Sequence, residues 1–185
     1  ASLKDPETAQ ENTLQNLLKV YQGSQYGTDH TAASVSSYTD YQKAFPIKSY
    51  PQFKPLLDRV MQGETALLLN EEPIGWAITR GTTKGVTKFI PMTPTDMRLR
   101  VAAGRAVMNY ALQTKQFDIF AGVNLNLNFP SKVGTIEVGD KKIDYGYSSG
   151  IYTKFVSQQT PVHSVPSQDQ IDALGGGKTM ADWKI

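Results

Sequence analysis

The stretch Trp76-Ala77-Ile78-Thr79-Arg80-Gly81-Thr82-Thr83-Lys84-Gly85-Val86-Thr87-Lys88, followed by Phe89-Ile90-Pro91-Met92-Thr93, decides the fold. Ile74, Trp76 and Ile78 alternate with smaller residues, which is the period-two pattern of a β-strand. The pattern then gives way to threonines, glycines and lysines. Glycines let backbone N–H groups approach an anion, hydroxyls donate further hydrogen bonds, and lysine adds positive charge. The stretch therefore predicts a strand that leads into a phosphate-binding loop.

The glycine spacing separates this loop from the Walker loop. Gly81 and Gly85 enclose three residues, whereas the Walker loop needs four between its glycines and a Gly-Lys-Ser/Thr ending. The spacing excludes a P-loop NTPase. Composition alone leaves open a surface loop rich in Thr, Gly and Lys that binds nothing.

The length, composition and charge of the chain narrow the class of protein to which it can belong. With 185 residues, of which 39% are hydrophobic and 19% charged, the chain is long enough to bury a core. Its 19 basic and 17 acidic residues are mixed along the sequence, so we expect neither a nucleic-acid partner nor an anionic membrane. Without cysteine there is no disulfide, thiolate nucleophile or Cys-based zinc site. Because it lacks a long apolar run and begins with polar residues, we expect a cytoplasmic protein.

Helical patterns dominate the first part of the chain. An amphipathic stripe predicts a helix that packs on the domain and ends near Gln22-Gly23. The stripe consists of Leu14, Leu17, Leu18 and Tyr21. Residues 23–36 have loop composition. A short helix is expected over residues 37–45, where Pro46 stops it. The next helix has Pro51 in its first turn and Gly63 as its C-terminal stop.

The second part mixes helix and strand patterns. Thr93 and Pro94 are typical of a helix start, and the apolar spacing after them predicts one long helix from about Pro94 to Lys115. Alternation predicts a strand over residues 117–129 and a hairpin over residues 135–147 around Gly139-Asp140. Ser167 and Gln170 have capping-box spacing before a short helix. The fold class expected is α/β, with helices packed on a mixed sheet that includes a β-hairpin.

Other catalytic arrangements have little support in the sequence. His30 and His163, the two histidines, lie in loop-like surroundings and are interpreted as surface residues rather than as catalytic bases. Glu71 and Glu72 are adjacent, and neighbouring residues in extended chain point apart, so a solvated pair is favoured over a metal site. We predict no catalytic base and no metal ligand in this chain.

The loop resembles the first adenylation motif of the adenylate-forming enzymes, in particular the GH3 acyl-acid amido synthetases (the GH3 auxin-responsive promoter family). Their pattern is Ser-Ser-Gly-Thr-Thr/Ser-x-Gly-x-x-Lys, followed by an aliphatic-Pro segment and a Thr. A second resemblance lies upstream at the matching distance, in Phe45, Pro46, Ile47, Tyr50, Arg59, Val60, Gly63 and Glu64. Tyr26-Gly27 is similar to the family's Thr-x-Tyr-Gly segment. The hairpin and the Ser148-Ser149-Gly150 step after it resemble a further family passage less specifically.

The resemblance implies an ATP-dependent ligase that activates a carboxylate as an acyl-adenylate, releases pyrophosphate and transfers the acyl group to an amine or amino acid. It implies that the ATP phosphates are held by Thr79, Arg80, Gly81, Thr82, Thr83, Lys84, Gly85 and Lys88. Arg80 departs from the family, which usually has Ser there. Mg2+ would accompany ATP. The helix after the loop would help to wall the acid pocket with Met97, Val101 and Gly104, and plain core packing is the alternative for these residues.

The family's later motifs, a Tyr-x-x-Ser/Thr-Glu segment and a ribose-binding Asp, are missing from the sequence. We therefore expect residues 1–185 to be a single partial domain, the N-terminal segment of a larger adenylating domain, that is inactive alone. Expected partners are a small carboxylic acid and an amine or amino acid. An incomplete sheet edge would favour self-association. The alternative is a non-catalytic α/β module that binds a nucleotide, another anion or a partner protein.

Overall fold

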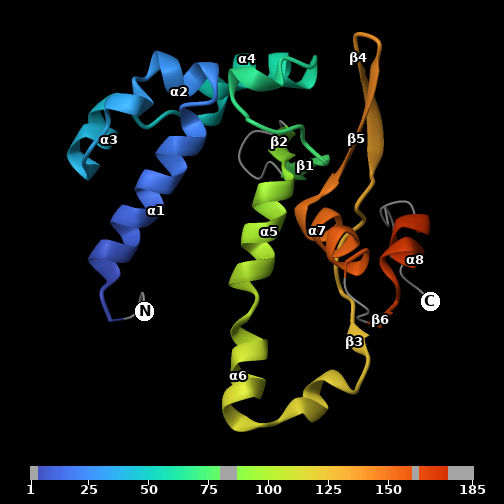
Figure 1. The fold of residues 1–185 in the computed structure, drawn as a ribbon. Coiled ribbons are helices and arrows are strands. Elements are labelled where there is room, and N and C mark those ends of the chain that lie inside the picture. Colours follow the sequence, from blue (N-terminus) through green and yellow to red (C-terminus); the bar gives the residue numbers. More distant parts are fainter. Residues whose placement is uncertain (1–3, 80–86, 160–162, 175–185) are drawn as a thin grey trace. The chain divides into compact units, whose positions relative to one another are not determined.

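The computed structural model describes residues 4–79, 87–159 and 163–174 (Figure 1). The chain divides into two compact units, Ala1–Glu72 and Pro73–Ile185. Helices form the described part of the first unit, and the second combines helices with strands. The α/β class predicted from the sequence is confirmed. None of the described helices is both long enough and apolar enough to cross a membrane.

The first unit is built from α-helices and short 3-10 helices. They are α1 (Pro6–Tyr21), α2 (Gln25–Asp29), η1 (Ala32–Ser34), α3 (Tyr38–Ala44), α4 (Tyr50–Met61) and η2 (Thr65–Leu67). Capping side chains set helix starts by accepting hydrogen bonds from backbone N–H groups. Asp5 caps α1 and Ser37 caps α3. Gly63 follows α4 with φ of 107°, a left-handed conformation that favours glycine.

The helices predicted in this unit are confirmed, and Leu18, Ala32 and Val35 form one buried cluster between them. Residues 23–36, however, are not a plain loop, because they contain α2 and η1. The Ser24 hydroxyl accepts a hydrogen bond from Gly27 N at 3.0 Å and thereby caps α2. Gly27 lies so close to the end of α1 that a Cβ there would be 1.8 Å from the carbonyl oxygen of Tyr21. Tertiary contact thus stabilises a helix too short to leave an apolar period.

The second unit contains a four-stranded mixed sheet in the order β2-β1-β5-β4. Its strands are β1 (Gly75–Thr79), β2 (Lys88–Met92), β4 (Gly134–Val138) and β5 (Lys141–Tyr147). Strand β1 is antiparallel to β2 and parallel to β5, and β5 is antiparallel to β4. The predicted hairpin is therefore confirmed as β4–β5. At its tip Gly139 has φ of 59°, which suits a tight turn.

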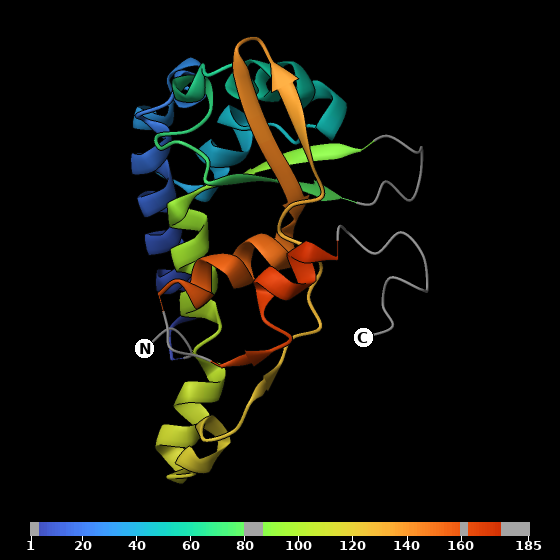
Figure 2. The ribbon, with the colours of Figure 1, turned by 90° about the vertical axis from the view of Figure 1, so that its right-hand side faces the viewer.

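The described part of this unit contains four α-helices, which are α5 (Pro94–Ala103), α6 (Ala106–Thr114), α7 (Ser148–Ser157) and α8 (Gln168–Ala173). Of these, α5 and α7 pack on the sheet and close its core, while α8 lies against α7 (Figure 2). The core joins Ala77 and Met92 of the sheet to Met97 of α5 and Ile151 of α7. Burying such side chains contributes about 1.5–3 kcal/mol each for the larger ones. The Thr93 hydroxyl caps α5, as the sequence predicts.

Two sequence predictions in this unit are wrong. The single helix expected over residues 94–115 is broken between α5 and α6, where Gly104 and Arg105 each have ψ of −2° and interrupt the helix. Glycine is a poor helix former, which favours a break at that position. The strand expected over residues 117–129 is instead a 3-10 helix, η3 (Phe117–Phe120), and a short strand, β3 (Asn124–Leu125). β3 pairs with β6 (Ser164–Val165) in a parallel ladder of two residues. Alternating apolar and polar residues do not make a long strand unless a long partner strand supplies the hydrogen bonds.

A polar network fastens α8 to the segment that connects β3 to β4. The Asp172 carboxylate accepts hydrogen bonds from Ser131 N (2.6 Å), Ser131 Oγ (2.5 Å), Gln168 Nε2 (3.1 Å) and Lys154 Nζ (3.3 Å). Gln168, itself 4% exposed, accepts a hydrogen bond from Asn126 Nδ2 at 3.3 Å. Burial by itself would raise the pKa of Asp172, but the hydrogen bonds it accepts outweigh burial and lower that pKa below its usual value.

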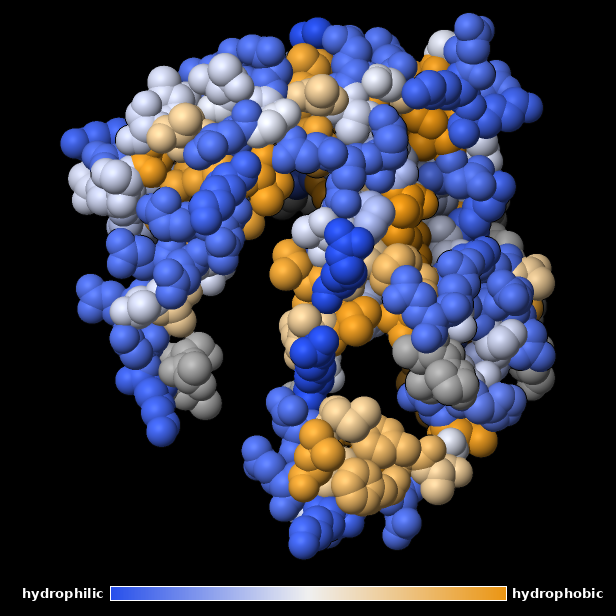
Figure 3. All heavy atoms as spheres, in the orientation of Figure 1, coloured by the Kyte–Doolittle hydropathy of each residue, from blue (hydrophilic) through white to orange (hydrophobic). Residues whose placement is uncertain are grey.

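Exposed apolar side chains gather over α6 and the segment that follows it (Figure 3). They belong to Val107, Met108, Tyr110, Leu112, Phe117, Ile119, Phe120, Val123, Leu125 and Leu127, which we call the apolar patch. Leu127 is 80% exposed. Soluble proteins rarely leave so many large apolar groups together in water, and such patches mark interaction surfaces.

Candidate functional site

The predicted phosphate loop connects β1 to β2. Arg80, Gly81, Thr82, Thr83, Lys84 and Gly85 lie outside the described residues, whereas Thr79 and Lys88 are described. These two residues are directly opposite each other in the β1–β2 ladder. Opposite residues of an antiparallel pair have Cα atoms about 5 Å apart and side chains on the same face. The Thr79 hydroxyl and the Lys88 ammonium therefore emerge together at the base of the loop, and both residues are exposed.

The parallel pairing of β1 with β5 places a second group at the same sheet edge. Ile78 pairs with Tyr147, so both strands end within one residue of this pair. Carboxyl ends of parallel strands meet at one edge of a sheet, which is where ligands of α/β proteins bind. Helix α7 begins there with Ser148 and Ser149, directly after β5. The loop base and the start of α7 are thus neighbours.

The start of α7 carries polar side chains whose position beside the loop the sequence did not reveal. Arg100 of α5 donates from Nη1 to Ser148 Oγ at 3.3 Å and from Nε to Asp96 at 3.0 Å. The Ser149 hydroxyl accepts a hydrogen bond from Phe129 N at 3.4 Å. Helix N-termini and guanidinium groups both favour anions. The signal that could have found these residues is a serine pair directly after a strand, but only the β1–β5 pairing brings it to the loop.

Gly150 allows another part of the chain to cross close to the start of α7. A Cβ at Gly150 would lie 2.1 Å from the Phe129 carbonyl oxygen and 2.5 Å from Ser131 N. These are backbone atoms, which cannot yield as a flexible side chain would. Any side chain at this position would therefore push the segment over residues 129–131 away from α7.

The residues predicted to wall an acid pocket do not lie on one open surface. Met97 is fully buried in the core with Ala77 and Ile151, Val101 is half-buried, and Gly104 is exposed at the end of α5. Packing accounts for Met97 without a ligand. Substrate contact by Val101 and Gly104 stays a prediction.

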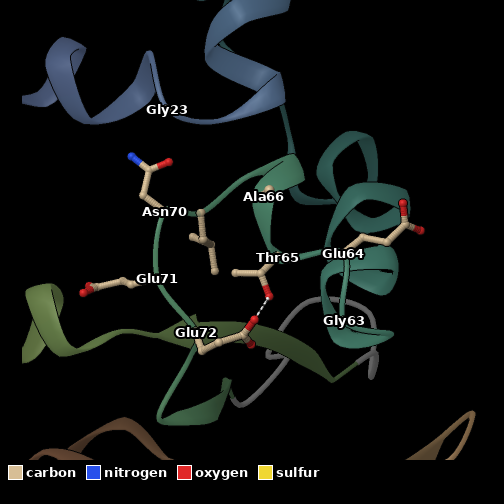
Figure 4. Close-up of a pocket in the computed structure, with 9 residues that line it drawn as sticks. Gly23, Gly63, Glu64, Thr65, Ala66, Asn70, Glu71 and Glu72 are labelled. Atoms are coloured by element: carbon tan, nitrogen blue, oxygen red, sulfur yellow. Dashed lines mark hydrogen bonds between the residues drawn. The ribbon is translucent and has the colours of Figure 1, made fainter.

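An acidic cleft of about 620 Å³ lies in the first unit (Figure 4). Glu64, Glu71 and Glu72 line it, but their carboxylates point in different directions. Glu64 pairs with Arg59, which lowers its pKa by hydrogen bonding, and Glu72 accepts from Thr65 Oγ1 at 2.7 Å. In the part of the chain that the structure describes, no group of three or more potential ligands could hold a metal ion.

The histidines differ in their surroundings. His163 is exposed, as predicted. His30 is half-buried and stacks on Tyr26 with ring centroids 4.0 Å apart, so the expectation of a plain surface residue is wrong for it. The short helix α2, which the sequence did not predict, brings these two rings together.

Comparison with known proteins gives one consistent family. The model of the "GH3 family N-terminal domain" matches residues 1–170. The jasmonoyl–L-amino acid synthetase GH3.5 of Oryza sativa subsp. japonica is 24% identical over 130 residues, which are 70% of this chain and 22% of that protein. The indole-3-acetic acid-amido synthetase GH3.15 of Arabidopsis thaliana is 33% identical over 64 residues, 34% of this chain and 11% of that protein.

Solved structures agree with this at the level of the fold. The structure described as "AtGH3.15 acyl acid amido synthetase in complex with 2,4-DB" aligns with a TM-score of 0.61 and 16% identity, over 88% of this chain and 29% of that one. A second structure of the GH3.15 acyl acid amido synthetase gives a TM-score of 0.62, 18% identity and 81% coverage of this chain. The chain spans about a fifth of the length of the first jasmonoyl relative.

Proposed function

The chain belongs to the GH3 family, and from that premise we propose that it is the N-terminal segment of an ATP-dependent acyl-acid amido synthetase. Such an enzyme would activate a small carboxylic acid as an acyl-adenylate and transfer the acyl group to an amine or amino acid. One observation carries the proposal. The segment with the adenylation-like motif leaves and re-enters the sheet through the opposed pair Thr79 and Lys88, at the edge where β5 runs into α7.

In this proposal the loop binds the phosphates of ATP. Thr79 supplies a hydroxyl donor and Lys88 a positive charge, both at the loop base. Gly81 and Gly85 would let backbone N–H groups approach the phosphates. These donors stabilise the negative charge that develops as pyrophosphate leaves. The Mg2+ expected with the nucleotide has no group of ligands among the described residues of this chain.

The apolar patch supports a larger adenylating domain. Its side chains are 47–80% exposed, and from residue 123 to 127 every second side chain belongs to it. A period of two with one apolar face is typical of a strand that faces a core. We propose that further sheet and helix of a GH3-length protein cover this patch, and that residues 1–185 alone are inactive and tend to self-associate. The cytoplasmic location of the protein stays a prediction.

The test is carboxylate-dependent ATP–pyrophosphate exchange in a polypeptide that carries residues 1–185 and the remainder of an adenylating domain. Lys88→Ala should reduce exchange by about 100-fold or more, since it removes the positive charge that would stabilise the reacting phosphates. Gly81→Val should abolish exchange, because its side chain would block the backbone approach. Lys142→Ala is the matched control, because its side chain is 77% exposed on β5, and it should leave exchange unchanged.

Two outcomes would contradict the proposal. If Lys88→Ala and Gly81→Val both exchange as the parent does, the loop does not bind the reacting phosphates. If ATP binds but no acid elicits exchange, the alternative of a non-catalytic nucleotide-binding module replaces the ligase.

A further inference from the structure

Two segments that phosphate chemistry leaves unexplained meet in the first unit. They are Tyr26-Gly27 and Phe45-Pro46-Ile47, and both contribute to one cleft of about 730 Å³. Aromatic side chains dominate this cleft, and its main lining residues are Tyr21, Tyr26, Tyr38, Tyr41, Phe45 and Lys48. All of them belong to the first unit, so the cleft is defined without the loop between β1 and β2.

Stacked and tilted rings form the apolar wall of the cleft. The Phe45 ring lies 5.2 Å from Tyr41, 5.6 Å from Tyr21 and 5.4 Å from His30, measured between ring centroids. Tyr38 is 66% exposed at the cleft's margin. Aromatic pairs at such distances are mutually stabilising and hold their rings in place. Tyr21, Tyr41 and Phe45 also pack against the buried cluster of this unit, so the wall is a fixed apolar surface lined by rings, with tyrosine hydroxyls among its groups.

Lys48 places a positive charge in this aromatic setting. Its Nζ lies 4.9 Å from the ring centroid of Tyr26 and 5.8 Å from that of Phe53. His30 Nδ1 is 2.8 Å from the Tyr26 carbonyl oxygen and therefore donates to it. This assigns His30 Nε2 as the acceptor for Lys48 Nζ at 3.4 Å. One of the three N–H groups of the ammonium is accounted for in this way.

The charge of the cleft is not balanced by an acid. Its lining residues include a lysine and no carboxylate, and the ion pairs of the described residues do not involve Lys48. Lys48 is half-buried, and an ammonium partly withdrawn from water gains from a charge-assisted hydrogen bond to an anion. A ligand complementary to this cleft therefore combines an anionic group with a flat apolar body.

We propose that the cleft binds a small aromatic carboxylate, with its carboxylate on the Lys48 ammonium and its ring against Tyr41 and Phe45. A charge-assisted hydrogen bond to the ammonium would fix the acid group. A volume of about 730 Å³ is within the range of small-molecule sites. This inference goes beyond the proposed ligase activity, because binding here requires no ATP and no residue of the phosphate loop.

The test uses the 185-residue chain itself, without nucleotide. 1-Naphthoate is titrated into labelled protein, and backbone amide chemical shifts are followed by NMR. For a ligand of this size we expect a dissociation constant on the order of 0.1–1 mM, with shift changes centred on the cleft. The uncharged analogue 1-naphthamide should bind about tenfold more weakly or worse, because it cannot pair with Lys48.

Substitutions separate the charge from the apolar wall. Lys48→Gln should weaken naphthoate binding about tenfold or more and leave naphthamide binding unchanged. Lys43→Gln is the matched control, since it removes the same charge from the exposed surface of α3 outside the cleft. Tyr38→Ala removes a mostly exposed wall residue without touching the core, so it should weaken both ligands while the protein stays folded. The amide spectrum reports folding directly in each variant.

Several results would overturn the proposal. They are equal binding of naphthoate and naphthamide, unchanged naphthoate binding in Lys48→Gln, shift changes centred elsewhere, or no binding at 10-fold above the expected range. Should Lys48→Gln unfold the chain, the naphthamide comparison and Tyr38→Ala decide the matter alone. Failure here leaves pyrophosphate exchange untouched, so the two proposals stand or fall separately.

Discussion

Replacing Asp172 with asparagine would show how strongly the polar network holds α8 in place. The substitution keeps the shape of the side chain and removes its charge. The carboxylate accepts hydrogen bonds from the backbone and hydroxyl of Ser131, from Gln168 and from Lys154. An amide offers one oxygen where the carboxylate offers two, so at least one donor would face an N–H group instead of an acceptor.

The magnitude follows from these contacts. A buried donor left without an acceptor costs about 1–3 kcal/mol. The Lys154 side chain is 45% exposed, so losing its ionic partner adds at most about 1 kcal/mol after solvent screening. We therefore expect Asp172→Asn to lower the free energy of unfolding of the second unit by about 1–4 kcal/mol.

The pH dependence has a definite sign. Burial raises and the accepted hydrogen bonds lower the pKa of Asp172, and the net effect is a pKa below the usual value. A group whose pKa is lower in the folded state stabilises above its unfolded pKa, about 3.9 for Asp. The stabilisation is lost as pH falls through the folded pKa. The gap between the parent and Asp172→Asn should therefore be constant from pH 7 to about pH 5 and narrow below about pH 4.

Urea unfolding followed by the fluorescence of Trp76 is the assay, in a Trp183→Phe background that leaves one indole. Trp76 is 4% exposed within the second unit and so reports its unfolding. Asp169→Asn, an exposed acid on the same helix, is the control and should cost less than about 1 kcal/mol. A loss below about 0.5 kcal/mol for Asp172→Asn, or a gap that persists unchanged at low pH, would refute the reasoning.

Two further substitutions test close packing and the apolar patch. Gly150→Ala places a Cβ 2.1 Å from a backbone oxygen and should lower the free energy of unfolding by about 3 kcal/mol in thermal unfolding. Gly75→Ala is the control, because its Cβ would have its nearest contact at 3.5 Å, and it should cost less than about 1 kcal/mol. Equal losses in the two variants would contradict the close approach at Gly150. Leu127→Asp should reduce self-association of the chain in light scattering without lowering its melting temperature, because Leu127 is 80% exposed, while Leu17→Asp on α1 serves as the control. If the parent chain self-associates and Leu127→Asp has the same mass in light scattering, the interface lies elsewhere.

Local signals predicted much of the fold because their causes lie within a few residues. Caps such as Ser37 and Thr93 satisfy N–H groups three positions away, and the Gly139 turn closes a hairpin between adjacent strands. The strand before the loop was visible from alternation alone. Where a prediction failed, as over residues 117–129, the pattern of apolar residues was present but a long partner strand was not paired with it in the described residues.

The candidate site divides in the same way. Thr79 and Lys88 were recognisable from residue types in the loop, the serines of α7 were noted only for a weak family resemblance, and Arg100 was not singled out. Nothing near Ser148 in the sequence indicates that β5 pairs with β1.

The sequence by itself determined the residue types of the loop, the hairpin, several helix caps and the family resemblance, since each depends on neighbours along the chain. Only the tertiary structure decided which strands are parallel, where Gly150 must lack a side chain, and that Lys48 faces aromatic rings in a cleft whose described lining residues include no acid. The physical reason is range. Propensity and capping act over a few residues, whereas burial and electrostatic pairing depend on groups that only folding brings within a few ångströms of each other.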